Sequence, residues 1–262
     1  MSISMEGVQC DFLSELDVVW DRPETLTEKP FHYCPGCGHS VMNRLLMEVV
    51  QELGIQDKTI GVAPVGCAVF MYHYMDIDMQ EAAHGRASAV ATGIKRILPD
   101  RFVFSYQGDG DLAAIGTAET IHTVNRGENI IMLFINNGIY GMTGGQMAPT
   151  TLKGSITSTT PAGREFDRHG YPLDITPLIS QLPGASYVTR QSVDTAKAVR
   201  KTKKALTKAF QFHMNGGEGV CFIEIVSNCP SGWKMTPIES NEWLQDHIFN
   251  HYTLGDIKPF PK

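Results

Sequence analysis

Residues 102–139 read FVFSYQGDGDLAAIGTAETIHTVNRGENIIMLFINNGI, and they show the organisation of the chain most clearly. An apolar run at 102–106 leads into a glycine-containing turn and then into a helix expected over 111–125. A second predicted strand follows at 129–135, and it is apolar from 130 onward. A strand, a helix and a strand in this order predict two parallel strands joined by a helical crossover. The sequence therefore predicts an α/β protein.

The same alternation continues on both sides of this stretch. Helix-periodic apolar residues follow Ser40, a candidate N-cap, and end at Gly54. Strands that alternate with helices predict a mostly parallel sheet with helices on both faces. We expect one domain over 1–262, with an extended N-terminal arm at 1–33 and an irregular C-terminal tail at 228–262. The other predicted helices lie at 85–98, 175–182 and 193–213, and the other strands at 59–63, 186–189 and 220–226.

The composition argues against several classes of function. The 262 residues carry 22 Lys and Arg against 28 Asp and Glu, a net charge of −6, whereas nucleic-acid-binding domains usually present a basic face. The longest apolar runs, such as 130–135, are far shorter than the ~20 residues of a membrane-spanning helix. The N-terminus lacks the basic start and apolar core of a secretory signal. We therefore expect a cytoplasmic protein with no nucleic-acid or membrane partner.

The turn QGDGD at 107–111 lies between a predicted strand and a predicted helix, where free backbone N–H groups can bind a phosphate. Gly108, Gly110 and Ala113 satisfy the relaxed dinucleotide pattern G-x-G-x-x-G/A. Asp109 argues against a nucleotide alone, because a carboxylate beside a pyrophosphate is unfavourable unless a divalent cation lies between them. The turn therefore predicts a site for a metal and a diphosphate.

Further ligands for such a cation follow the next predicted strand, where Asn136, Asn137, Gly138 and Ile139 stand in a row. The carboxyl ends of neighbouring parallel strands lie at one edge of the sheet, so these residues should meet Asp109 in one crevice. A carboxylate, an amide oxygen and a carbonyl, with diphosphate oxygens and a water, give Mg²⁺ its preferred octahedral shell. The sequence predicts a magnesium site at this edge.

A G-D-G turn followed about thirty residues later by N-N resembles the signature of thiamine-diphosphate enzymes. The resemblance implies that Asp109 and Asn137 bind Mg²⁺ through their side chains and Ile139 through its carbonyl. A nicotinamide or flavin nucleotide is the alternative occupant of the glycine turn.

Four of the six cysteines lie on predicted turns. Cys34 and Cys37 belong to Y-C-P-G-C-G-H, Cys67 to P-V-G-C and Cys229 to N-C-P-S-G-W. Three kinds of site fit them: a [4Fe–4S] cluster, a structural Zn²⁺ site or a thioredoxin-like C-x-x-C pair. A single C-x-x-C favours a site assembled from distant loops, and spacing alone puts iron–sulfur only modestly ahead of zinc.

Three further residues are not expected to bind a metal. Cys10 lies in the N-terminal arm and is expected to be an incidental thiol. Cys221 lies inside the strand at 220–226 and is expected to act as a small buried apolar residue. His39 follows the C-x-x-C and is expected to make a local hydrogen bond rather than bind metal, because four thiolates complete a cluster.

The cysteine motifs and the thiamine-diphosphate signature together resemble the β subunit of the 2-oxoacid:ferredoxin oxidoreductases. The resemblance covers roughly 31–233 and includes A-H-G-R-A at 83–87 and Y-G-M-T-G-G-Q at 140–146. It implies a thiamine-diphosphate-binding fold with a [4Fe–4S] cluster near the thiamine, and oxidative decarboxylation of a 2-oxo acid that requires coenzyme A and passes electrons to ferredoxin. The cluster ligands that it implies are Cys34, Cys37, Cys67 and Cys229.

The resemblance also implies partner chains. Thiamine enzymes combine two α/β modules, and this sequence shows the one that binds diphosphate and metal. The aminopyrimidine-binding module would belong to a separate α subunit, so we expect the isolated chain to be inactive; γ and ferredoxin-like subunits are further expected partners. Two alternatives remain: a non-oxidative thiamine decarboxylase or synthase subunit with a structural zinc, and a non-catalytic redox or zinc-binding module.

The candidate catalytic residues are His84, Arg86 and Met142. His84 and Arg86 open a predicted helix and could face the diphosphate or the substrate carboxylate, with a capping or surface role as the alternative. Some pyruvate-specific relatives carry asparagine at the position of Met142, so we expect 2-oxoglutarate or a branched-chain 2-oxo acid. The segment 143–163 is expected to face either substrate and coenzyme A or the α subunit. The candidate cofactor-binding residues are Gly66, Cys67, His84, Gly108, Asp109, Gly110, Asp111, Asn137, Ile139, Tyr140, Gly141, Met142 and Thr143.

Overall fold

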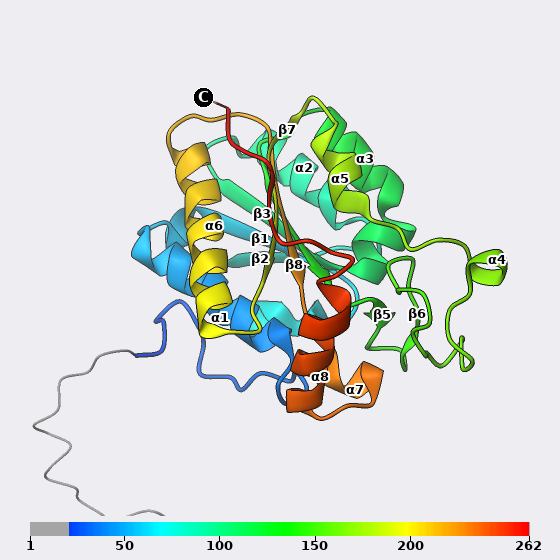
Figure 1. The fold of residues 1–262 in the computed structure, drawn as a ribbon. Helices are drawn as coiled ribbons and strands as arrows, with labels where there is room; N and C mark the ends of the chain where they lie inside the picture. The colour runs from blue at the N-terminus through cyan, green and yellow to red at the C-terminus, as the bar shows by residue number, and fades with distance from the viewer. Residues whose placement is uncertain (1–20, 262) are drawn as a thin grey trace, which may run out of the picture.

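The computed structural model describes residues 21–261; residues 1–20, which include Cys10, and residue 262 lie outside the described part. Within that part, seven strands form the central sheet in the order β2-β1-β3-β4-β8-β7-β9 (Figure 1). The first six pair in parallel, and β9 runs antiparallel to β7. The predicted α/β class with a mostly parallel sheet is confirmed. The strands are β1 (Thr59–Ala63), β2 (Asp78–Glu81), β3 (Phe102–Gly108), β4 (Ile131–Asn136), β7 (Ala185–Ser192), β8 (Val220–Val226) and β9 (Gly255–Lys258).

Helices cover both faces of the sheet (Figure 1). In β4, Ile131, Leu133 and Ile135 pack into the core beneath α1 and α6, while Met132 and Phe134 pack into the core on the opposite face. Because both faces are covered, β4 is apolar from Ile131 to Ile135 instead of alternating with polar residues. One face carries α1 (Gly38–Glu52) and α6 (Ala196–Met214), and the other carries α2 (Ala87–Ile97), α3 (Thr117–Asn125) and α5 (Ile175–Ser180).

The C-terminal tail differs from the prediction of an irregular segment, which was wrong. It contains α7 (Pro230–Trp233), α8 (Pro237–Trp243), the π-helix η5 (Leu244–Ile248) and β9. The start of α8 has a local cause: the Thr236 hydroxyl accepts the Glu239 N–H, and the Glu239 carboxylate accepts the Thr236 N–H. This capping box was readable in the sequence, whereas the pairing of β9 depends on β7, far away in the chain.

Three further elements depart from the predictions. Helix α1 begins at Gly38 after Cys37 as N-cap, two residues before the predicted cap Ser40. Strand β2 was missed because it is a polar, largely exposed edge strand without an apolar run. The helix predicted over 111–125 is interrupted: a π-turn, η4 (Asp111–Ile115), ends at Gly116, whose backbone packs against the Gly85 carbonyl and leaves no room for a side chain.

The long segment 137–171 is ordered around a buried cation. Arg164 is 3% exposed and donates hydrogen bonds to the carbonyls of Pro149 (2.8 Å), Thr151 (2.5 Å) and Tyr171 (2.8 Å). One guanidinium therefore donates hydrogen bonds to backbone carbonyls that belong to no helix or strand. The segment also holds the hairpin β5 (Ile139–Tyr140) and β6 (Gln146–Met147), and the short helix α4 (Phe166–His169). The remaining short elements are the 3-10 helices η2 (Gln56–Lys58) and η3 (Val69–His73).

The parallel strands end together at one edge of the sheet. The turns that follow β1, β3, β4 and β8 begin there, and they carry Cys67, Asp109, Asn137 and Cys229. Open parallel sheets bind ligands at this edge, so the fold brings the predicted motifs to a binding position. Among residues 21–261, no helix combines the length and the apolar character needed to cross a membrane.

Candidate cofactor site

A cavity of about 220 Å³ lies at this edge of the sheet. All thirteen candidate cofactor-binding residues line it, from Gly66 and His84 to Thr143. The wall also includes His39, Val65, Ile115 and other residues that the motifs did not indicate. The motifs from separate strand ends therefore share one hollow with polar and apolar walls, as ligand sites usually do.

Asp109 is a buried carboxylate in the wall of the cavity. It is 4% exposed; its Oδ1 accepts the Gly110 N–H (2.9 Å), and its Oδ2 accepts the Ile139 N–H (3.0 Å) and the Thr150 hydroxyl (3.1 Å). Burial raises the pKa of Asp109 to about 7, although these hydrogen bonds oppose the shift. The buried negative charge therefore favours a positive partner, which a bound divalent cation would supply.

The other two predicted magnesium ligands lie beside it. Asn137 is 8% exposed, and its Oδ1 accepts the same Ile139 N–H at 3.3 Å. Asp109, Asn137 and Ile139 thus meet as the sequence predicted, offering carboxylate, amide and carbonyl oxygens. This hard-oxygen donor set fits Mg²⁺.

Asp111 hydrogen-bonds to three separate segments of the chain around the cavity. Its Oδ1 accepts the N–H groups of Gly85 (2.9 Å) and Val65 (3.2 Å), and its Oδ2 accepts the Gln107 side-chain amide (2.6 Å). His84 Nδ1 lies 2.7 Å from the same Oδ1, which fixes the ring and leaves Nε2 for a ligand. Asp111 lines the cavity, but its oxygens are already used to hold His84 and the neighbouring turns.

The other two candidate catalytic residues lie differently. Arg86 is not among the lining residues; its guanidinium forms an ion pair with Glu119 at 2.5 Å, on the outside of the protein. Met142 lines the cavity and is 52% exposed, so its apolar side chain stands at the mouth.

The cysteine sulfurs approach the cavity from behind Gly141. A methyl group in place of its hydrogen would lie 3.2 Å from Cys229 Sγ and 3.4 Å from Cys67 Sγ. Burial raises the pKa of Cys37 to about 11, and those of Cys67 and Cys229 to about 12; neighbouring thiols add to each shift. Backbone N–H groups of His39 and Gly232 hydrogen-bond to Cys37 and Cys229.

The four cysteine thiols lie close enough to interact electrostatically, but they do not form a compact site for a single metal ion. The exposed Cys34 interacts electrostatically with Cys37 and Cys67, and Cys37 and Cys67 interact with Cys229. In the described range 21–261, no three His, Cys, Asp or Glu side chains are arranged to hold one metal ion. Four thiols on turns with N–H donors to sulfur are a donor set that fits a [4Fe–4S] cluster. Cys221, as predicted, is a buried residue of β8.

His39 joins the cysteine loop to the cavity wall. Its Nδ1 is hydrogen-bonded to the Tyr106 hydroxyl at 2.8 Å, so it makes the local bond expected from the sequence. Burial lowers the pKa of His39 to about 4, which keeps the ring neutral. Sequence reasoning missed Tyr106 and also Thr150, the hydroxyl that binds Asp109. No local pattern marks either residue, because their partners are distant in the chain.

Comparisons with known proteins agree with this geometry. The family model described as thiamine pyrophosphate enzyme, C-terminal TPP binding domain, matches residues 64–225. That range begins at the turn after β1 and ends within β8, so it contains most of the cavity wall.

Among curated proteins, ketoisovalerate oxidoreductase subunit VorA of Methanothermobacter marburgensis is 41% identical over 93% of this chain and 51% of its own length. The 2-oxoglutarate synthase subunit KorB of Archaeoglobus fulgidus is 36% identical over 88% of this chain and 82% of its own length. The chain thus spans about half the length of the VorA relatives that it matches.

A solved structure, 2-oxoglutarate:ferredoxin oxidoreductase from Magnetococcus marinus with 2-oxoglutarate, coenzyme A and succinyl-CoA bound, has the same fold. It superposes with a TM-score of 0.72 and 30% identity, covering 87% of this chain and 73% of that chain. The chain therefore belongs to the thiamine pyrophosphate enzymes, and within them to the subunits of 2-oxoacid:ferredoxin oxidoreductases that carry the TPP-binding domain.

Proposed function

We propose that this chain binds thiamine diphosphate, Mg²⁺ and a [4Fe–4S] cluster, and that with partner chains it catalyses the oxidative decarboxylation of a 2-oxo acid with coenzyme A and ferredoxin. One observation carries the proposal. Asp109, Asn137, Ile139 and Cys67 line the same cavity, and Cys229 Sγ lies directly behind Gly141 in its wall, close enough to interact electrostatically with Asp109.

When bound, thiamine diphosphate supplies the nucleophile and the electron sink for decarboxylation, and the cluster supplies a one-electron acceptor. In our proposal Asp109, Asn137 and the Ile139 carbonyl hold Mg²⁺, and the N–H groups of the glycine turn face the diphosphate. His84, oriented by Asp111, presents Nε2 to the ligand as a hydrogen-bonding group. Ile115 and Met142 provide apolar wall that limits access of water.

The substrate class follows from the mouth of the cavity and from the relatives. Met142 offers no hydrogen bond to a substrate, which suits a branched-chain 2-oxo acid at least as well as 2-oxoglutarate. Relatives named for ketoisovalerate and for 2-oxoglutarate are 41% and 36% identical to this chain. We propose one of these two substrate types, and a cytoplasmic enzyme.

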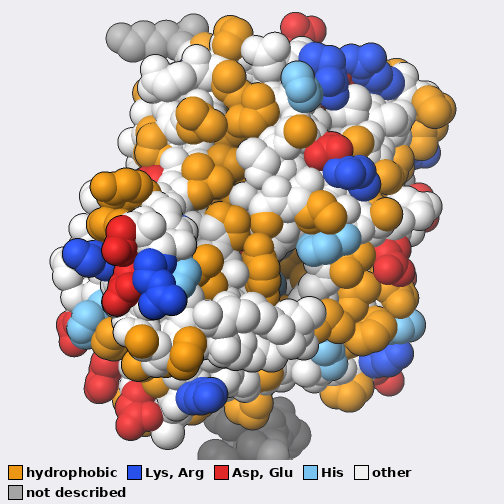
Figure 2. All heavy atoms as spheres, turned by 90° about the vertical axis from the view of Figure 1, so that its right-hand side faces the viewer, with side chains coloured by type: hydrophobic (Ala, Val, Ile, Leu, Met, Phe, Trp, Pro, Cys, Tyr) orange, Lys and Arg blue, Asp and Glu red, His pale blue; other side chains and the backbone are white. Residues whose placement is uncertain are grey.

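Partner chains are supported by the apolar surface. Figure 2 shows broad apolar areas on the face opposite α6, with basic and acidic side chains scattered among them. Large exposed apolar side chains include Ile115 (50%), Met142 (52%) and Leu178 (51%), and two of them stand at the cavity. Such surface usually contacts another chain. We propose that an α subunit with the aminopyrimidine-binding module covers the mouth, and that γ and ferredoxin-like subunits complete the complex.

The test is anaerobic purification with any co-purifying chains, followed by iron, sulfide, zinc and thiamine analysis. We expect about four irons and four sulfides per chain. Cys229→Ser should lose the cluster, while Cys221→Ser, a buried cysteine inside β8, should keep it. A colourless chain with about one zinc per four-cysteine site would overturn the proposed electron transfer.

A further inference from the structure

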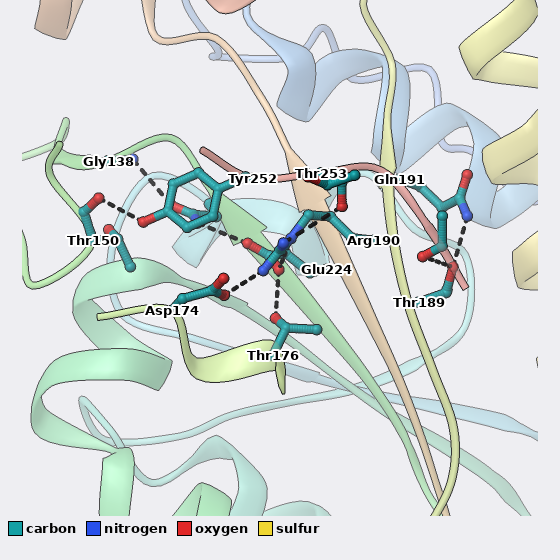
Figure 3. A network of polar contacts seen from close by, with 12 residues as sticks. Gly138, Thr150, Asp174, Thr176, Thr189, Arg190, Gln191, Glu224, Tyr252 and Thr253 are labelled. Carbon is teal, nitrogen blue, oxygen red and sulfur yellow. Dashed lines mark hydrogen bonds and ion pairs between the residues drawn. The ribbon is translucent and has the colours of Figure 1, made fainter. Parts of the chain in front are cut away.

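A buried ionic network is hydrogen-bonded through Asn136 to the turn at Gly138 (Figure 3). At its centre is Glu224 of β8, 1% exposed, whose Oε2 accepts the Arg190 Nε–H at 2.6 Å and the Thr176 hydroxyl. Arg190 is 3% exposed and also forms an ion pair with Asp174. The other carboxylate oxygen of Glu224, Oε1, accepts the side-chain amide of Asn136 at 2.7 Å.

Glu224 and the hydroxyl of Tyr252, which also hydrogen-bonds to the Asn136 side chain, both set which way the Asn136 amide points. An ionised carboxylate can only accept hydrogen bonds, so Asn136 must turn its NH₂ group toward Glu224. Its Oδ1 then faces the other way and accepts the Gly138 N–H at 3.2 Å. This bond closes an Asx turn, which Gly138 completes with a left-handed φ of 67°.

The closed turn sets the residues on either side of Gly138. The Ile139 N–H reaches Asp109 Oδ2 at 3.0 Å, and Asn137 Oδ1 lies 3.3 Å from the same N–H. If the Asn136 amide rotated, its NH₂ would face the Gly138 N–H, two donors would oppose each other, and the turn would open. A carboxylate that does not line the cavity therefore helps to position two proposed Mg²⁺ ligands, together with the bonds that Thr151 and Trp233 donate to the carbonyls of Gly138 and Asn137.

We propose that Glu224 and Asn136 are positioning residues for the divalent cation: the acceptor-only carboxylate locks the Asn136 amide, the amide closes the turn, and the turn presents Asn137 and Ile139 beside Asp109. The inference rests on the proposed Mg²⁺–thiamine diphosphate site. A purely structural role, in which Glu224 offsets the buried charge of Arg190, is the competing explanation.

The test exchanges the two partners. Glu224→Gln puts an amide against an amide, and Asn136→Asp puts a carboxylate against a carboxylate; each single change breaks the complementarity. The double variant restores the complementarity with the roles reversed. The new amide at position 224 donates a hydrogen bond, and the new carboxylate at position 136 accepts from this amide and from the Gly138 N–H. Asp174→Asn is the matched control, since it removes the other carboxylate of Arg190 without touching Asn136.

Two readouts use the full chain with its co-purifying partners. In titrations with Mg²⁺ and thiamine diphosphate, each single variant should bind roughly five- to tenfold more weakly, the effect of about one lost hydrogen bond. The double variant should return to within about twofold of the wild type, and Asp174→Asn should bind as the wild type does. Hydrogen exchange of residues 136–141 without cofactor should quicken in both single variants and recover in the double variant.

The outcomes separate the two proposals. If the wild type does not bind Mg²⁺ and thiamine diphosphate, the proposed function fails, and the exchange data alone decide whether the pair closes the turn. If the wild type binds but the double variant is no better than the single ones, the positioning role is refuted. If Asp174→Asn weakens the binding of Mg²⁺ and thiamine diphosphate as much as the single variants do, the positioning role is also refuted. The network then serves to balance the buried charge of Arg190.

Discussion

Replacing Asp109 with asparagine should stabilise the cofactor-free chain at neutral pH while abolishing its cation site. The pKa of this carboxyl is raised from its ordinary 3.8 to about 7, chiefly by burial. A raised pKa means that the charged form is disfavoured in the folded state, so stability is lost as pH rises from about 4 to about 7. At 1.36 kcal/mol per pH unit, the buried charge costs about 4 kcal/mol above pH 7.

The variant removes that cost but also loses contacts. The asparagine oxygen can still accept from Ile139 and Thr150, whereas its NH₂ would face the Gly110 N–H, a loss of about 1–2 kcal/mol. We therefore expect Asp109→Asn to match the wild type near pH 5 and to exceed its free energy of unfolding by about 2–3 kcal/mol at pH 8.

Urea unfolding of the full cofactor-free chain at the two pH values measures this. Adding Mg²⁺ and thiamine diphosphate should stabilise the wild type by about 2.7 kcal/mol at a hundredfold excess over Kd, and should leave the variant unchanged. Asp111→Asn is the control: its carboxylate holds the Gly85 and Val65 N–H groups, so this change should destabilise the chain. A variant at position 109 that is less stable than the wild type at pH 8 would refute the reasoning.

Three further changes probe other walls of the site. Gly141→Ala places a methyl 3.2 Å from Cys229 Sγ and 3.4 Å from Cys67 Sγ, so iron content after anaerobic purification should fall; unchanged occupancy would mean that the sulfurs can move aside. Met142→Asn adds a hydrogen-bonding group at the mouth and should raise kcat/KM for pyruvate relative to branched-chain 2-oxo acids, by up to about tenfold. Arg164→Met removes the donor shared by the Pro149, Thr151 and Tyr171 carbonyls; limited proteolysis should cleave 148–171 faster, and equal rates would contradict this.

The fold was predictable where the chain is buried on both sides. The predicted strands 59–63 and 220–226 coincide with β1 and β8, because each is an apolar run covered by helices on both faces of the sheet. The proximity of the predicted Mg²⁺ ligands could be predicted for a similar reason. They follow the ends of successive strands, and in a parallel sheet these ends lie side by side. Edge strand β2 and strand β9 lacked that signal, since their placement depends on neighbours rather than on their own composition.

The supporting residues of the site were not predictable. Thr150 binds Asp109 from 41 residues away, and Glu224 binds Asn136 from 88 residues away. No periodicity or motif links partners at such separations, and the same is true of His39 and Tyr106, which are 67 residues apart. The sequence predicted which groups gather in the cavity, and the three-dimensional packing revealed what holds them.

The most direct test of the account is whether substrate reduces the cluster. The complex purified without oxygen is mixed with a 2-oxo acid, with and without Mg²⁺ and thiamine diphosphate, and the visible absorption and electron paramagnetic resonance of the cluster are followed. We predict reduction by a branched-chain 2-oxo acid or 2-oxoglutarate that requires Mg²⁺ and thiamine diphosphate and disappears in Cys229→Ser. A cluster that binds but stays oxidised with every 2-oxo acid, or a zinc site in its place, would contradict the claim that the cavity at Gly141 joins the two cofactors.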